Sequence, residues 1–116
     1  MIKDTCEVVC VDKAKAEKLR KAIPENNQCQ RMVEIFKVLA DVTRIKIISA
    51  LELEELCVCD IAALTVLDQS LVSHHLRAMR LLNIVKCRKD GKMAFYSIGD
   101  NHIRAMLAVA RDHARE

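Results

Sequence analysis

Two pairs of cysteines carry the most reactive chemistry in this sequence. Cys57 and Cys59 stand one residue apart, directly before an apolar segment that predicts a helix, and Cys6 and Cys10 lie near the N-terminus. Because the dipole and free N–H groups of a helix start favour thiolate over thiol, we expect Cys57 and Cys59 to be good metal ligands. Four thiolates suit soft or borderline cations, so the two pairs together predict a site for Cd²⁺, Pb²⁺ or Zn²⁺. The sequence leaves open whether the N-terminal pair reaches its own Cys57 and Cys59 or those of a second copy.

The same thiols allow other interpretations. The thiols could be packed in the interior or have no functional role. Alternatively, they could form disulfides between the two pairs and sense oxidants instead of metal. The first residues are partly acidic and lack the apolar stretch of a signal peptide, so we expect a cytoplasmic protein, in which clustered cysteines more often bind metal. No apolar run approaches the roughly 20 residues that a membrane span requires, so no membrane partner is expected. Cys29 and Cys87 stand alone and are interpreted as bystanders.

A second group of metal-competent side chains lies in the last segment of the chain: Asp100, His102, His113 and Glu116. The two histidines are about three helical turns apart, so they share a helix face but lie about 16 Å apart along the axis, too far for one ion. If two copies pack antiparallel about a twofold axis, His102 of one copy meets His113 of the other, which would create two identical sites of carboxylate and imidazole ligands suited to Zn²⁺. The dimer contact would come from an apolar stripe on this helix: Ile103, Met106, Leu107 and Ala110. Spacing alone favours the plainer interpretation of ordinary polar residues on a terminal helix.

A mainly helical protein has to position these groups. The 116 residues are 52% hydrophobic and 3% aromatic, with two glycines and one proline, a composition that favours a helical core over a sandwich or barrel. Apolar periodicity predicts helices over residues 12–23, 28–40, 41–52, 59–67, 68–83 and 101–116. In the third of these, Ile45, Ile48 and Leu51 are expected to face the core. The segment 84–98 is β-rich on both sides of Asp90-Gly91, which predicts a hairpin with a two-residue turn at that dipeptide.

Basic and short polar residues gather on the hairpin and on the helix before it. Such a helix can enter a major groove, and a basic hairpin can reach neighbouring phosphates. The alternative is a solvated basic turn, and the net charge of +3 permits nucleic-acid binding without deciding it. Adjacent histidines point to different sides of a helix, so one of them is expected to bond internally and neither to chelate a metal. The predicted DNA contacts are Ser70, Ser73, His74, His75, Arg77, Arg80, Arg88, Lys89 and Lys92.

Several motifs in order resemble one protein family. The segments ELCVCDIA, SLVSHHLRAMRLLNIV, RKDGKMAFYSIGDNHI and DHARE are similar to the ArsR–SmtB metal-responsive repressors over residues 30–116, and DTCEVVC is most similar to the CadC-type cadmium/lead sensors among them. The resemblance implies a mainly α (α+β) winged helix-turn-helix fold, with a two-stranded β-hairpin wing and N- and C-terminal dimerisation helices. It implies a cysteine-bearing arm over 1–11 and a single domain over 12–116. Within that domain it places the recognition helix at about 68–83, the wing at about 84–98 and the dimer helix at about 101–115.

The resemblance also implies a function and a role for each ligand residue. It implies a homodimer that binds a palindromic operator in double-stranded DNA and releases it on binding metal, which derepresses metal-resistance or efflux genes. Cys57 and Cys59 match the family's Cys-x-Cys, and Cys6 and Cys10 match arm cysteines that come from the other subunit. Asp100, His102, His113 and Glu116 match the dimer-helix site as Asp-x-His and His-x-x-Glu pairs. The main alternative is a winged-helix repressor that senses redox state through a disulfide. A metal store without DNA would leave the basic hairpin unused, and no catalytic pattern indicates an enzyme.

Overall fold

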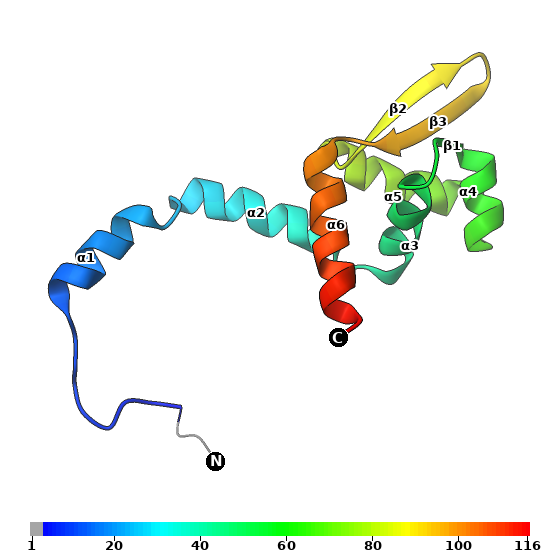
Figure 1. Ribbon diagram of the computed structural model, residues 1–116. Coiled ribbons are helices and arrows are strands. Elements are labelled where there is room, and N and C mark those ends of the chain that lie inside the picture. The colour runs from blue at the N-terminus through cyan, green and yellow to red at the C-terminus, as the bar shows by residue number, and fades with distance from the viewer. Residues whose placement is uncertain (1–3) are drawn as a thin grey trace. The chain divides into compact units, whose positions relative to one another are not determined.

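The computed structural model describes residues 4–116 and divides the chain into two compact units, one ending at Val33 and one over Glu34–Glu116 (Figure 1). Residues 1–3 of the predicted arm lie outside the described residues. The described part of the chain contains α1 (Lys13–Ala22), α2 (Asn26–Leu39), α3 (Val42–Leu51), β1 (Leu56–Cys57), α4 (Val58–Thr65), α5 (Gln69–Leu81), β2 (Val85–Asp90), β3 (Met93–Ile98) and α6 (Asn101–Ala114). The predicted order of helices and hairpin is confirmed. The division into an arm over 1–11 and a domain over 12–116 stays a prediction.

Aspartate side chains begin four of these helices. Asp12, Asp41, Asp68 and Asp100 each accept a hydrogen bond from the backbone N–H three residues further on. An aspartate in this position satisfies a free N–H group and complements the positive end of the helix dipole. The start of α4 differs, because its N-cap residue is Cys57, which makes no side-chain capping bond.

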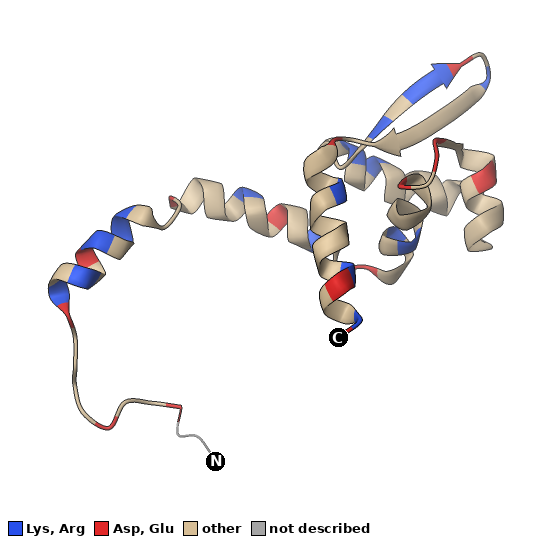
Figure 2. Ribbon diagram, viewed as in Figure 1, with Lys and Arg blue, Asp and Glu red and all other residues tan. Residues whose placement is uncertain are grey.

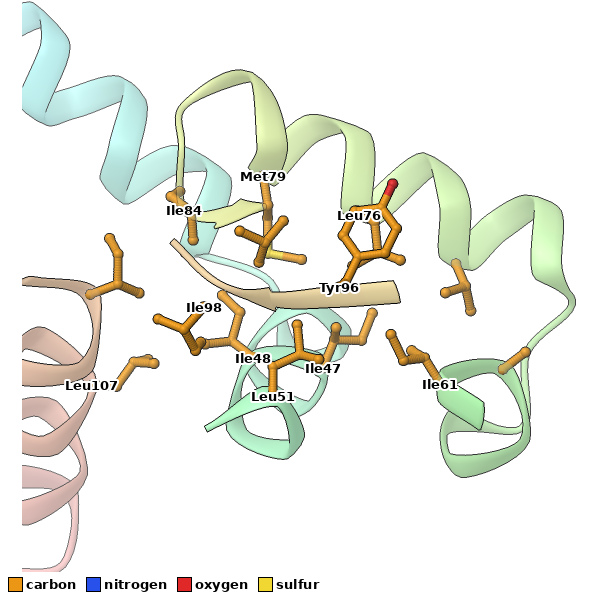
Figure 3. Packing of buried hydrophobic residues seen from close by; sticks show 14 residues of the cluster. Ile47, Ile48, Leu51, Ile61, Leu76, Met79, Ile84, Tyr96, Ile98 and Leu107 are labelled. Atoms are coloured by element: carbon orange, nitrogen blue, oxygen red, sulfur yellow. The ribbon is translucent and has the colours of Figure 1, made fainter. Parts of the chain in front are cut away.

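The core of the second unit lies between α3, α4, α5, α6 and the sheet (Figure 3). Its largest fully buried side chains are Ile47, Ile48, Leu51, Ile61, Val72, Leu76, Met79, Ile84 and Val85. The expectation for α3 was partly wrong, since Ile45 is 39% exposed and Ile47 takes the inner position. At 3.6 residues per turn, Ile47, Ile48 and Leu51 form one stripe, and Ile45 is turned well away from the centre of that stripe.

The strands form an antiparallel sheet in the order β1-β3-β2. The sequence predicted the β2–β3 hairpin but missed β1, in which Cys57 pairs with Phe95 of β3. The turn also lies one residue later than predicted, because Asp90 pairs with Met93 and leaves Gly91 and Lys92 as the two turn residues. Gly91 has a φ of +59°, which glycine adopts without steric cost at the first position of a tight hairpin turn. Through β1, the segment that carries the Cys-x-Cys becomes part of the wing sheet.

The apolar residues of α6 are divided differently from the expected dimer stripe. Ile103 is 7% exposed and Leu107 is 6% exposed, because both pack into the core of their own protomer. Of the predicted stripe, only Met106 and Ala110 remain available to a second copy, and Val109 stands beside them with 69% exposure. None of the helices in residues 4–116 is both long and apolar enough to cross a membrane.

Candidate thiolate centre and nucleic-acid interface

Both cysteines of the Cys-x-Cys line one cavity of about 240 Å³. Cys57 is 4% exposed at the N-cap of α4, whereas Cys59 in the first turn of that helix is exposed. Residues from α5 and from the wing complete the lining: Gln69, Ser73, Lys89, Lys92, Met93 and Ala94, together with Val58 of α4. The cavity therefore lies where α4, α5 and the hairpin meet.

The backbone at the start of α4 explains why both thiols reach the same space. Two residues apart inside a regular helix, they would point to nearly opposite sides. Cys57 has an extended backbone, with φ −80° and ψ 163°, so it precedes the regular helix that contains Cys59. Gln69 Nε2 donates a hydrogen bond to Cys59 Sγ at 3.4 Å and thus joins this thiol to the first residue of α5. Sequence reasoning missed Gln69, because no period links residues ten positions apart.

The donor set suits the predicted cations but is incomplete within the described residues. Residues 4–116 contain no group of three or more His, Cys, Asp or Glu side chains placed to hold a metal ion. Cys57 and Cys59 supply two soft ligands, and a tetrahedral site for a thiophilic cation needs more. Cys6 and Cys10 are exposed and belong to the first unit. Their role as the remaining ligands stays a prediction.

The predicted ligands of α6 form two separate pairs. His102 Nδ1 lies 3.5 Å from Asp100 Oδ2, and His113 Nδ1 lies 2.9 Å from Glu116 Oε2. Asp100 is held in place by its capping bond, in which Oδ1 accepts from the Ile103 N–H at 3.2 Å. The structure thus brings each imidazole to its predicted carboxylate. Union of the two pairs across a dimer stays a prediction.

Most predicted DNA contacts face a groove between α5 and the wing. A second cavity of about 310 Å³ shares Ser73 and Lys89 with the thiol cavity and adds Arg77, Arg80 and the half-buried Cys87. Figure 2 shows the Lys and Arg residues on α5 and on β2 toward the hairpin tip. Ser70 and His74 on α5 are exposed. The arrangement presents cationic and short polar side chains from two elements to the same ligand, as a duplex requires.

Two predicted DNA contacts are bonded to side chains outside their own helix or strand. Arg44 Nε donates to His75 Nδ1 at 3.0 Å, and burial, followed by the Arg44 charge, lowers the pKa of His75. His75 is therefore the internally bonded member of the histidine pair, as expected. Arg88 Nη2 donates to Glu55 Oε1 at 2.6 Å, with its guanidinium 4.7 Å from the Phe95 ring centre. This hydrogen bond lowers the pKa of Glu55. DNA contact by His75 or Arg88 stays a prediction.

Comparison with known proteins agrees with this geometry. Residues 41–86 match the family described as "Bacterial regulatory protein, arsR family". The cadmium resistance transcriptional regulatory protein CadC homolog of Staphylococcus aureus is 40% identical over 117 residues, which cover 100% of this chain and 96% of that protein. The transcriptional repressor SmtB homolog of Synechocystis is 42% identical over 103 residues, 86% of this chain and 78% of that protein. A homodimeric winged helix-turn-helix DNA-binding domain from Mycobacterium bovis has the same fold, with a TM-score of 0.74 at 23% identity over 80% of this chain and 89% of that one.

Proposed function

Because this chain belongs to the arsR family of bacterial regulatory proteins, whose relatives include metal-responsive transcriptional repressors, we propose that its homodimer binds a palindromic operator and releases it when Cd²⁺, Pb²⁺ or Zn²⁺ binds. The released operator would control metal-resistance or efflux genes. The observation that carries the proposal is the shared cavity, in which Cys57 and Cys59 meet residues predicted to contact DNA. A ligand of these thiols therefore acts at the junction of the recognition helix and the wing.

The thiols would hold the cation as thiolates, with Cys6 and Cys10 of the same or of a second copy as further ligands. The bound cation supplies a fixed link among its ligands. Within the protomer, the pairing of Cys57 with Phe95 connects the site to the wing, and the Gln69 bond to Cys59 connects it to α5. If the ion-bound arrangement fits DNA less well, binding shifts the population away from the DNA-competent state, with a coupling typically of about 1–3 kcal/mol.

We propose that a second copy covers the exposed apolar side of α6. A groove of about 580 Å³ on this side is lined by Phe36, Ala105, Met106, Val109, Ala110 and His113. Phe36 is 57% exposed and Val109 is 69% exposed, and exposed apolar patches of this kind mark interaction sites. His113 at this groove would place the His113–Glu116 pair at the dimer contact, where a twofold axis could unite it with the Asp100–His102 pair of the second copy as a Zn²⁺ site. Such a dimer would present its two recognition helices to successive major grooves, about 34 Å apart.

A Cd²⁺ titration tests the thiolate switch. The reduced, metal-free protein would be used to select its preferred duplex from a randomised library, and Cd²⁺ would then be added with and without that duplex. We expect an intense thiolate-to-metal absorption band in the ultraviolet, saturating at a single ion per protomer, together with release of the duplex. Cys57→Ser should lose the band and the release while it still binds the duplex. Cys29→Ser is the matched control and should behave as the wild type, because Cys29 does not line the cavity and donates instead to the Pro24 carbonyl at 3.4 Å.

The same experiment separates this proposal from the redox alternative. Normal release of the duplex by Cys57→Ser in the presence of Cd²⁺ would contradict the thiolate switch. Release by peroxide, with no response to Cd²⁺ under reducing conditions, would instead support a disulfide mechanism.

A further inference from the structure

Two lysines of the wing share the cavity that holds the thiols. Lys89 near the end of β2 and Lys92 in the hairpin turn line the cavity of about 240 Å³ together with Cys57 and Cys59. None of the residues that line this cavity is Asp or Glu. In this space the thiols are therefore the groups that can carry negative charge opposite the two ammonium groups.

Strand register places Lys89 on the side of the sheet that faces α5. Lys89 pairs with Ala94, and both residues line the two cavities between α5 and the wing. Lys86 pairs with Ser97 three residues earlier on the same strand, and side chains alternate between the faces of a strand, so Lys86 lies on the opposite face. In agreement, the Lys86 charge acts on Glu55. The wing thus carries a lysine with the same chemistry that does not reach the cavity.

We propose that Lys89 and Lys92 are shared between the thiolates and DNA, so that the two ligands compete for the same ammonium groups. This inference rests on the proposed function. In the DNA-bound state the two lysines would neutralise backbone phosphates, which provide most of the affinity of such complexes. In the ion-bound state, with Cys6 and Cys10 as further ligands, four thiolates would surround one divalent cation and leave a net negative charge. That charge would draw the two lysines into the cavity.

The chemistry of lysine allows both positions. Its ammonium group sits on a flexible four-carbon stem and can move between partners without backbone rearrangement. Both Lys89 and Lys92 are exposed and also line the cavity, so each can turn toward solvent and a duplex. An ammonium group bonded inside the cavity is no longer available to a phosphate. Charge competition would therefore contribute to release in addition to any movement of α5.

The first test uses metal-free, DNA-free protein and measures the electrostatic contact directly. Each thiol would be alkylated at low ionic strength with anionic iodoacetate and with neutral iodoacetamide, and the rates would be resolved by peptide mass spectrometry. The ratio of the iodoacetate rate to the iodoacetamide rate reports the local electrostatic potential at a thiol, because both rates are proportional to the same fraction of thiolate and that fraction cancels. A sphere of 240 Å³ is about 8 Å across, and a unit charge at that distance in water changes the local concentration of an anion about twofold.

We expect the ratio at Cys59 to fall about twofold in Lys89→Gln and in Lys92→Gln, and further in the double variant. Lys86→Gln is the matched control and should leave the ratio at Cys59 unchanged. Cys6 and Cys10 in each protein provide an internal reference. An unchanged ratio at Cys59 in the double variant would overturn the inference, even if the protein is a metal-responsive repressor.

The second test measures the competition itself. DNA affinity falls with salt concentration, and the plot of the two logarithms has a negative slope. In the double variant this slope should become shallower by about 0.9 for each lysine that contacts a phosphate. The fold loss of DNA affinity on addition of Cd²⁺ should then be several-fold smaller than in the wild type. A loss equal to that of the wild type would overturn the competition. A wild-type protein that binds no duplex would overturn the proposed function and the competition with it, whereas the alkylation ratio would still show the contact between lysine and thiol.

Discussion

An ion pair at the end of α3 fixes α6 to the segment that leads to Cys57. Arg111 Nη2 bonds to Glu52 Oε1, and Arg104 Nη1 donates to the Glu52 backbone carbonyl at 3.0 Å. The Glu52 side chain is 16% exposed and the Arg111 side chain is 35% exposed. The pair therefore lies between a solvated surface pair and a buried one. Its strength determines how firmly the helix with the His113–Glu116 pair is held to its own protomer.

The intermediate exposure sets the expected magnitude. Exposed ion pairs contribute about 0–1 kcal/mol, and removal of one partner of a buried pair costs about 3–5 kcal/mol. For Glu52→Ala we therefore predict a loss of about 1.5 kcal/mol in the free energy of unfolding, which for a chain of this length lowers Tm by about 6 °C. A double-mutant cycle with Arg111→Ala should give an interaction energy of about 1 kcal/mol.

The assay is thermal unfolding followed by circular dichroism, at one fixed protomer concentration because dimerisation shifts Tm. The Glu17–Arg20 pair on α1 offers a matched control cycle, since its side chains are 59% and 68% exposed. That cycle should give an interaction energy of only a few tenths of a kcal/mol. If the Glu52–Arg111 cycle is no larger than the Glu17–Arg20 cycle, the reasoning from exposure is refuted.

Three further predictions concern the wing junction, the recognition helix and the dimer groove. Gly99→Ala should destabilise the fold well beyond the roughly 1 kcal/mol of a typical substitution, because its Cβ would lie 2.1 Å from the Asn83 carbonyl oxygen. Urea unfolding checks this. A cost no larger than that of Gly91→Ala, whose Cβ meets nothing within 4 Å and which is strained only by the φ of +59°, would disprove it. Since burial lowers the pKa of His75 from the usual 6.5, the unfolded chain binds more protons, and stability should be lost as the pH falls below 6.5 through the folded-state pKa. His75→Asn should remove this part of the pH dependence of Tm, and an unchanged profile would rule the explanation out. Val109→Glu should weaken the dimer at least about tenfold in sedimentation equilibrium, because it would bury an unpaired charge, and unchanged dimerisation would show that the second copy docks elsewhere.

The sequence predicted the elements with a local period better than the contacts between them. A helix was expected over 68–83 and is observed over Gln69–Leu81, because an amphipathic stripe repeats within each turn. Strand β1 was missed, since two residues show no period and their partners, Phe95 and Tyr96, are about 40 positions away. The inner face of α3 was assigned incorrectly at Ile45 because four of its ten residues are Val or Ile, so several stripes fit the same segment.

The candidate site shows the same limit. The types and spacing of Cys57 and Cys59 were enough to predict a pair of ligands. The histidine–carboxylate pairs of the last helix were expected from the family resemblance, since spacing alone favoured ordinary polar residues. The cavity that joins the thiols to Ser73, Lys89 and Lys92 depends on packing of three elements, which no local pattern encodes. The bond between Arg88 and Glu55 likewise joins residues 33 positions apart.

The missing cap of α4 has an evolutionary consequence. Serine is among the best N-cap residues, and it differs from cysteine by a single atom, yet Cys57 occupies this position without a capping bond. Cys57→Ser would offer the helix the hydroxyl that its first turn lacks. This variant, which under the proposed function no longer responds to metal, should therefore fold at least as stably as the natural protein. Selection for stability alone would therefore favour replacement of Cys57 by serine. Under the proposed function, its presence is a trade-off in which the protein gives up helix stability to retain a metal ligand.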